Sequence, residues 1–133
     1  MTEPARRLVL VVEDSDAIRT AFTILLEESG YDVAAAPNGA EAVRLAAERT
    51  PDLVLLDLGL PDIPGVEVAR QLKAAPRTQN TPVVALTGRD DDGDREALRA
   101  AGCAAYLVKP VDTQALIRAL PGYIEASSAV AEG

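Results

Sequence analysis

The chain has 133 residues, the length of one domain, and carries 13 Lys and Arg against 21 Asp and Glu, for a formal net charge of −8. This charge argues against nucleic-acid binding and against docking on an anionic membrane, and the absence of histidine excludes Ser-His catalysis, a histidine metal cluster and a phosphohistidine on this chain. The single cysteine, Cys103, excludes an internal disulfide and fits a reducing compartment, and no apolar run is long enough to cross a bilayer, so we expect a cytoplasmic domain without membrane insertion.

Short apolar runs predict the strands of a sheet. In chain order they are Leu8–Val12, a weaker run at Tyr31–Ala35, Leu53–Leu56, Pro82–Leu86 and Ala104–Val108. Apart from the weaker run they are continuously apolar rather than alternating. This pattern is typical of strands buried on both faces, and it indicates a parallel sheet covered by helices.

Helical periodicity fills the intervals between these strands. In chain order we expect helices from Ser15 or Asp16 to Gly30, from Asn38 to before Thr50, from Gly65 to about Ala75, from Asp91 to Ala101, and from Asp112 or Thr113 onward. Strand and helix therefore alternate five times, which predicts a doubly wound three-layer α/β sandwich. We expect one domain over residues 1–133, with a core of about 8–125 and frayed tails at 1–7 and 126–133.

Pro121 interrupts the last predicted helix. Proline lacks a backbone donor and clashes with the preceding turn, which costs about 3 kcal/mol inside a helix. We therefore expect this helix to end or kink near Leu120, with Tyr123 and Ile124 in a displaced final turn. An ordinary chain end is the alternative.

Chemically distinctive residues follow the four strongly predicted strands. In strand order they are Glu13 with Asp14, then Asp57, then Thr87 with Gly88, and finally Lys109 with Pro110. Because the carboxyl ends of parallel strands lie at one edge of a sheet, where ligands bind, we expect these residues to converge. Taken singly, each is explained by capping, a turn or solvation, but the combination is much harder to attribute to chance.

Three carboxylates at one place predict a bound cation, because clustered carboxylates repel one another unless a cation joins them. Oxygen ligands that fill only part of an octahedron suit Mg²⁺, which keeps several of its waters. We expect Asp14 and Asp57 to be direct ligands of the ion and Glu13 an outer one.

A carboxylate held beside Mg²⁺ can attack a phosphoryl group and form an aspartyl phosphate. The charge that develops on the phosphoryl oxygens requires donors already in place. Lys109 supplies an ammonium group, Thr87 a hydroxyl, and the small Gly88 an approachable backbone N–H.

Four motifs, taken together, resemble the receiver domain of two-component response regulators. They are Val12-Glu13-Asp14, Leu56-Asp57-Leu58-Gly59-Leu60-Pro61 with Gly65, Leu86-Thr87-Gly88, and Val108-Lys109-Pro110. The resemblance covers about Leu8 to Tyr123. It implies a flavodoxin-like sheet with the strand order 2-1-3-4-5.

The resemblance also implies the roles of individual residues. It makes Asp57 the phosphoacceptor, and it forms the Mg²⁺ site from Asp14, Asp57 and the backbone carbonyl of Gly59, with Glu13 acting through water. It further implies that Gly59 and Arg89 influence how fast water removes the phosphoryl group. We expect Gly59 to leave water access open and Arg89 to restrict it, with a net effect that the sequence leaves open.

A conformational switch is a further implication of the resemblance. Thr87 moves toward the phosphoryl group, and the aromatic side chain of Tyr106 turns inward. An ordinary half-buried strand tyrosine is the alternative for Tyr106. The resemblance also implies a cis peptide bond between Lys109 and Pro110.

These inferences predict a stand-alone receiver. It takes its phosphoryl group from a phosphohistidine on a sensor histidine kinase or histidine phosphotransfer protein, and it signals to a downstream protein target by contact. A homodimer through the fourth helix, fifth strand and fifth helix is a further expectation. We expect a signalling domain rather than an enzyme, one that catalyses only its own phosphorylation and dephosphorylation.

Three alternatives remain open. One is a Mg²⁺-dependent phosphohydrolase with an aspartate nucleophile, although such enzymes carry Asp-x-Asp and Asp57-Leu58-Gly59 lacks the second Asp. Another is a purely structural pseudo-receiver. The third is a receiver cut from a hybrid histidine kinase or a multidomain regulator.

Overall fold

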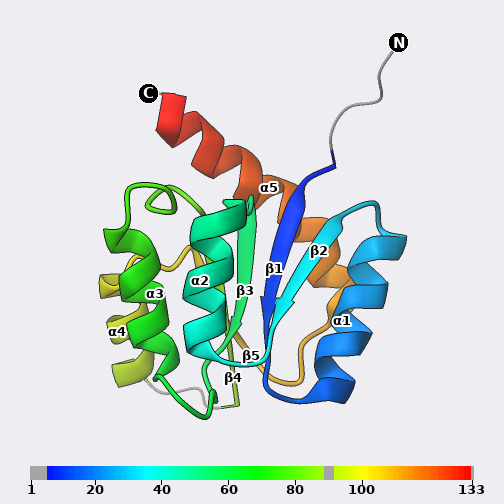
Figure 1. Ribbon diagram of the computed structural model, residues 1–133, viewed down its shortest axis with the longest axis horizontal. Coiled ribbons are helices and arrows are strands. Elements are labelled where there is room, and N and C mark those ends of the chain that lie inside the picture. Colours follow the sequence, from blue (N-terminus) through cyan, green and yellow to red (C-terminus); the bar gives the residue numbers. More distant parts are fainter. Residues whose placement is uncertain (1–5, 89–91, 133) are drawn as a thin grey trace.

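The computed structural model describes residues 6–88 and 92–132. Five parallel strands form one sheet in the order β2-β1-β3-β4-β5, and helices cover both of its faces (Figure 1). The strands are β1 (Leu8–Val12), β2 (Asp32–Ala36), β3 (Leu53–Asp57), β4 (Val83–Thr87) and β5 (Ala105–Val108). The helices are α1 (Asp16–Glu28), α2 (Gly39–Arg49), α3 (Gly65–Ala74), α4 (Asp92–Ala100) and α5 (Thr113–Glu132).

Two apolar layers flank the sheet, as the continuously apolar strands predict. Successive residues of β1 belong to different layers, since successive side chains of a strand point to opposite faces. Val9 and Val11 pack in the layer under α1 and α5, whereas Leu10 and Val12 pack in the layer under α2 and α3. Full burial of one such side chain contributes about 1.5–3 kcal/mol to stability, so the paired layers fix the sheet between its helices.

The helix boundaries follow the capping residues that the sequence contains. Ser15 accepts a hydrogen bond from the Ile18 N–H at the start of α1, and Asn38 accepts one from the Glu41 N–H at the start of α2. Gly30, with a φ of 99°, provides the left-handed turn after α1. The weakly predicted strand lies one residue later than expected, at Asp32–Ala36, and forms the edge of the sheet.

The last helix corrects one expectation. We expected this helix to end or kink near Leu120, and the first form is wrong, because α5 continues through Pro121 to Glu132. Leu120 and Ile124 lie one turn apart on the same face and are 0% and 4% exposed. Their burial offsets the cost of the proline, whose ring lies on the exposed side. No helix in the part of the chain that is described is long and apolar enough to cross a membrane.

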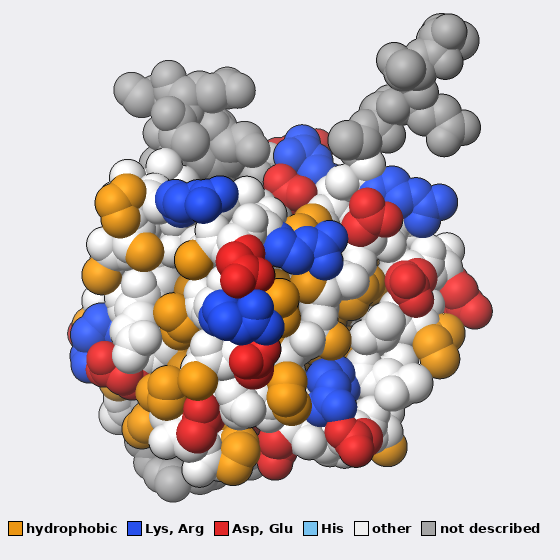
Figure 2. Space-filling view, viewed as in Figure 1, with side chains coloured by type: hydrophobic (Ala, Val, Ile, Leu, Met, Phe, Trp, Pro, Cys, Tyr) orange, Lys and Arg blue, Asp and Glu red, His pale blue; other side chains and the backbone are white. Residues whose placement is uncertain are grey.

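The face of the molecule seen in Figure 2 carries interspersed acidic and basic side chains and no continuous basic stripe. On α2, for example, the Arg44 guanidinium pairs with the Glu48 carboxylate at 3.0 Å and also with Glu41. Such exposed pairs contribute little to stability, typically 0–1 kcal/mol. These acidic side chains of α2 are therefore ordinary solvated surface.

Candidate functional site

The carboxyl edge of the sheet brings the predicted site residues together. Asp57 and Thr87 are the last residues of β3 and β4, while Glu13 directly follows β1 and Lys109 directly follows β5. With Asp14, Gly59 and Gly88 they line one cavity of about 680 Å³. Sequence reasoning could find this cluster because the strand ends alone determine which residues meet.

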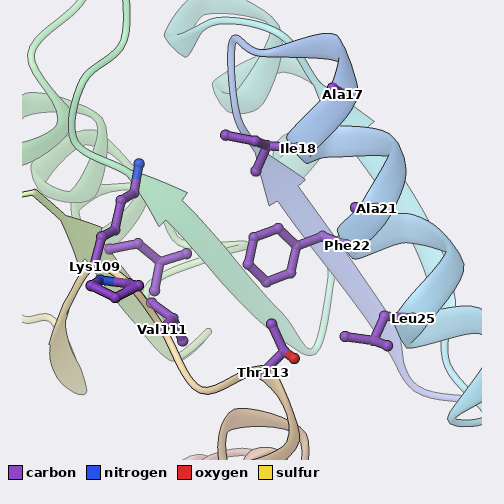
Figure 3. A pocket seen from close by; sticks show the side chains of 10 residues that line it. Ala17, Ile18, Ala21, Phe22, Leu25, Lys109, Val111 and Thr113 are labelled. Atoms are coloured by element: carbon purple, nitrogen blue, oxygen red, sulfur yellow. The ribbon is translucent and has the colours of Figure 1, made fainter.

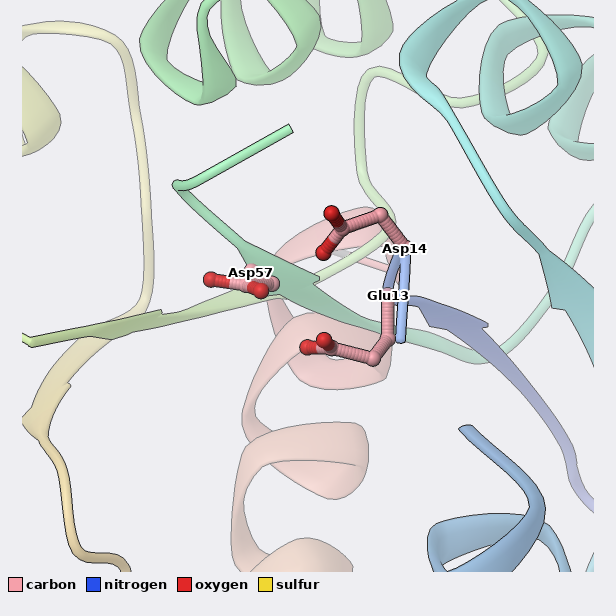
Figure 4. A group of neighbouring side chains, drawn as sticks. All are labelled: Glu13, Asp14 and Asp57. Carbon is pink, nitrogen blue, oxygen red and sulfur yellow. The ribbon is translucent and has the colours of Figure 1, made fainter. Parts of the chain in front are cut away.

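Three carboxylates converge in this cavity. Glu13, Asp14 and Asp57 each offer an oxygen within 4.8 Å of the others (Figure 4). Glu13 and Asp57 are 3% and 5% exposed, whereas Asp14 lies open to solvent. The cluster therefore has two buried members and one accessible member.

Backbone contacts hold Glu13 in place. Its N–H donates to the Ala36 carbonyl at 3.0 Å, which continues the pairing of β1 with β2 by one residue. Its carbonyl accepts a hydrogen bond from Arg19 at 2.8 Å, and its side-chain Oε1 accepts one from the Ser15 N–H at 3.2 Å. The start of α1 thus orients the carboxylate toward Asp57.

Lys109 supplies the positive charge of the cluster. Its Nζ lies 3.1 Å from Asp57 Oδ1 and 4.0 Å from Glu13 Oε2. Asp57 Oδ1 also accepts a hydrogen bond from the Gly59 N–H at 3.1 Å. The peptide bond that joins Lys109 to Pro110 is cis.

The pKa values of the two buried carboxyl groups, Glu13 and Asp57, are shifted in opposite directions. Burial, and after it a hydrogen bond with Asp57, raise the pKa of Glu13 to about 7. Burial also opposes the ionisation of Asp57, but hydrogen bonds from Glu13, the Gly59 N–H and Lys109 outweigh it and lower the pKa of Asp57. Two neighbouring carboxylates that compete for one proton fit a divalent cation, which replaces that proton as the positive charge between them.

Comparison with known proteins agrees with this geometry. The family model of the response regulator receiver domain matches residues 9–121. The chain belongs to this family. The polar-differentiation response regulator DivK of Brucella anthropi is 39% identical over 116 residues, which cover 87% of this chain and 94% of DivK.

Solved receiver structures share the fold. The receiver domain of a sensor histidine kinase from Pseudomonas aeruginosa, with a magnesium ion coordinated in its active site cleft, is 34% identical with a TM-score of 0.82, over 91% of this chain and 99% of that one. The chemotaxis protein CheY4 of Vibrio cholerae is 28% identical with a TM-score of 0.85, over 90% and 99% of the two chains. The predicted family, the (βα)5 fold and the strand order are confirmed.

The remaining predicted site residues of this receiver lie outside the carboxylate cluster. Tyr106, which is aligned with Ala85 of β4, is half-buried, and the Arg95 guanidinium of α4 lies 5.3 Å from the centre of its ring. This is within the distance of a cation–π contact. Sequence reasoning missed Arg95, because only the packing of α4 beside β5 brings it to the tyrosine. Arg89 lies outside the described residues.

The receiver also has an apolar hollow that the sequence did not reveal. It measures about 400 Å³ and lies between α1 and the segment that follows β5 (Figure 3). Phe22 of α1 and Val111 line it, and Ile18 and Lys109 line both this hollow and the carboxylate cavity. Its lining comes from segments almost 90 residues apart in the chain, so no local pattern predicts it.

Proposed function

We propose that this receiver accepts a phosphoryl group on Asp57 from a phosphohistidine of a sensor histidine kinase or a histidine phosphotransfer protein. The observation that carries the proposal is the position of Asp57. Its carboxylate is buried at the end of β3, beside the Glu13 and Asp14 carboxylates and 3.1 Å from the Lys109 ammonium. A nucleophile and its charge-stabilising partners are thus assembled at one point.

In the transfer, an oxygen of the Asp57 carboxylate attacks phosphorus. The new O–P bond forms while the P–N bond to the donor imidazole breaks, and the bonding electrons remain on the imidazole nitrogen, which takes up a proton. Lys109, the Thr87 hydroxyl and the Gly88 N–H stabilise the charge on the equatorial oxygens. Lys109 already contacts the attacking carboxylate, which supports this role.

The acidic cluster is proposed to hold Mg²⁺. Asp14, Asp57 and the carbonyl of Gly59 are the direct ligands, and Glu13 acts through a water molecule. The bound ion supplies positive charge against the phosphoryl oxygens. The three carboxylates, with hard oxygen donors within 4.8 Å of one another, support this assignment.

Signal output is proposed to start at Thr87 and Tyr106. Thr87 moves toward the phosphoryl group, and Tyr106 turns inward in response. The Arg95–Tyr106 contact supports this proposal because it links the tyrosine to α4, so a movement of the ring changes the surface of that helix. Gly59 and Arg89 are proposed to set the phosphate lifetime. At Gly59 a Cβ would lie 3.7 Å from Asp57 Oδ1, so a larger residue there would stand beside the phosphorylation site.

This signalling domain is proposed to catalyse only its own phosphorylation and dephosphorylation, and to pass the signal on by contact with a downstream protein. A homodimer through α4, β5 and α5 is a separate part of the proposal. A cytoplasmic location is part of the proposal, and the single cysteine, Cys103, suits a reducing compartment.

A second candidate is a receiver that works inside a longer sensor kinase. The observation that favours it is the likeness to the receiver domain of the Pseudomonas aeruginosa sensor histidine kinase. Both candidates use the same phosphoacceptor. Phosphotransfer profiling against candidate kinases, supplied with and without their own receiver domains, distinguishes them.

The phosphoacceptor is tested with the substitution Asp57→Asn. Wild type and variant are incubated with Mg²⁺ and a small phosphodonor such as acetyl phosphate, and intact mass spectrometry measures the added phosphoryl group. We expect label on the wild type and none on Asp57→Asn. Asp32→Asn, at an exposed carboxylate where β2 begins, is the control and should label like the wild type. Normal labelling of Asp57→Asn would overturn the assignment.

A further inference from the structure

The loop of residues 58–64 carries Gly59, and its two ends are fixed. The Leu58 N–H donates to the Leu86 carbonyl at 3.0 Å, which anchors the first end to β4. At the other end a Cβ on Gly65 would lie 2.7 Å from the Leu58 Cα, so the chain closes tightly on itself at a position that only glycine allows. The middle of the loop, which includes Gly59, needs a separate anchor.

Asp62 provides that anchor. Its Oδ1 accepts a hydrogen bond from the Gly39 N–H at 2.8 Å, and its Oδ2 accepts one from the Ala40 N–H at 3.0 Å. These are the first two residues of α2, and the bond to Gly39 above all keeps the pKa of Asp62 below its usual range. A carboxylate held through both oxygens is fixed in orientation as well as in position.

The approach of the loop to α2 requires a small residue at the helix start. A Cβ on Gly39 would lie 2.9 Å from Val68 Cγ2 and 3.0 Å from Ile63 Cβ. Either distance is too short for an unstrained contact. Gly39 therefore lets the loop approach closely enough for Asp62 to reach the helix.

α2 has a separate cap of its own. The Asn38 side chain accepts a hydrogen bond from the Glu41 N–H at 2.9 Å, and the Asn38 carbonyl accepts one from the Ala42 N–H at 3.1 Å. Asp62 is the only polar side chain in residues 58–64. Its bonds to a helix that is already capped therefore act mainly on the loop.

We propose that Asp62 is a positioning residue, which ties the loop to α2 and so holds the Gly59 carbonyl where Mg²⁺ binds. The inference rests on the proposed function, since it needs the metal site. Only Leu60 and Pro61 separate Gly59 from Asp62, and the proline ring fixes one of the few backbone torsions between them. Loss of the hydrogen bonds that hold Asp62 therefore also frees Gly59 to shift.

Two variants that each remove an acceptor from the first turn of α2 test the proposal. Asp62→Ala and Asn38→Ala both remove acceptors from the first turn of α2, but only Asp62→Ala frees the loop. The Mg²⁺ dissociation constant is measured by NMR from the shifts of the Gly59 and Gly88 amides. We expect Asp62→Ala to bind Mg²⁺ about tenfold more weakly, the lower end for groups that support metal ligands, and Asn38→Ala to bind like the wild type. Asp62→Asn keeps one acceptor oxygen and should fall between.

A second readout needs no metal. Hydrogen exchange of the Gly59 amide, which donates to Asp57 Oδ1, should be faster in Asp62→Ala than in Asn38→Ala. Equal Mg²⁺ affinity and equal exchange in the two variants would overturn the inference, as would equal weakening in both. If Asp62→Ala fails to fold, Asp62→Asn decides, and wild-type affinity and exchange in that variant would overturn the inference. A wild type that binds no Mg²⁺ would overturn the proposed function and this inference with it.

Discussion

The two ends of the parallel sheet both bury polar side chains, but they satisfy them in different ways. At the carboxyl end, Glu13 and Asp57 are partnered by each other and by Lys109, around an open cavity. At the amino end, Thr78 donates to the Leu72 carbonyl at 2.6 Å and is almost fully buried. The first arrangement gathers charge at one point, whereas the second completes the hydrogen bonding of the backbone.

Lys73 and Cys103 extend the contrast at the amino end. The Lys73 ammonium donates to the carbonyl of Thr81 and, at 3.3 Å, to that of Gln79. Burial lowers the pKa of Lys73 and raises the pKa of Cys103 to about 11. Burial and a shifted pKa therefore do not by themselves mark a functional site. The type of partner does, because backbone carbonyls fix a loop, whereas clustered charges bind and stabilise a charged ligand.

The largest effect is expected at the carboxyl end of the sheet, where Lys109→Met should slow phosphorylation. Removal of the ammonium 3.1 Å from Asp57 Oδ1 should slow phosphorylation by a small phosphodonor about 10³-fold, the upper range for loss of one charge-stabilising donor. The rate of appearance of the phosphorylated mass measures it. A variant that reacts at the wild-type rate would remove Lys109 from the mechanism.

Cys103 tests whether the amino end is chemically inert. With a pKa of about 11, only about 0.1% of the thiol is ionised at pH 8, against about a quarter for an ordinary cysteine. The more basic thiolate is also the better nucleophile, which recovers about tenfold of the rate, so a disulfide reagent should modify the folded protein roughly twentyfold more slowly than the chain in 8 M urea. Because the raised pKa keeps the thiol protonated, the rate should climb about tenfold per pH unit from 8 toward 10. Rapid modification of the folded protein at pH 8 would contradict this picture.

The sequence predicts the carboxyl end far better than it predicts the amino end. Asp57 and Lys109 are found from the sequence because each comes at the end of a short apolar run, and the parallel sheet then decides that they meet. Thr78 is not found, because its acceptor lies on a helix turn that no local pattern places beside it. Pro121 shows a different limit, since local helix preference is outweighed by the burial of Leu120 and Ile124.

Side-chain contacts between elements are the other part that sequence reasoning cannot reach. The hydrogen bond that the Gly39 N–H donates to Asp62 joins residues 23 apart, and the contact of Arg95 with Tyr106 joins α4 to β5. Strand order places these elements near one another but does not specify which side chains touch. The site was therefore predictable as a set of strand-end residues, and the contacts that hold it in shape were not.

Thr78→Val should show the structural role of the amino end. The substitution keeps the shape of the side chain but leaves the buried Leu72 carbonyl without the donor now at 2.6 Å, which should lower the free energy of unfolding by about 1–3 kcal/mol. Urea unfolding measures the loss, and Thr20→Val, at an exposed position on α1, is the matched control. Phosphorylation of the folded variant should keep the wild-type rate. A slower rate at equal folding would mean that the two ends of the sheet are coupled.

The smallest effect is expected for Lys73→Met, which repeats the Lys109 substitution at the amino end. The Lys73 ammonium is half-buried and its lowered pKa reflects the cost of that burial, so an apolar side chain of similar length should be accepted with a change of about 1 kcal/mol or less in unfolding free energy. The lost donations to the Thr81 and Gln79 carbonyls offset the relief of the buried charge. Urea unfolding gives the stability and acetyl phosphate labelling gives the rate, which should equal that of the wild type. If Lys73→Met slowed labelling as strongly as Lys109→Met, the partners of a buried lysine would not decide its role, and the distinction between the two ends would fail.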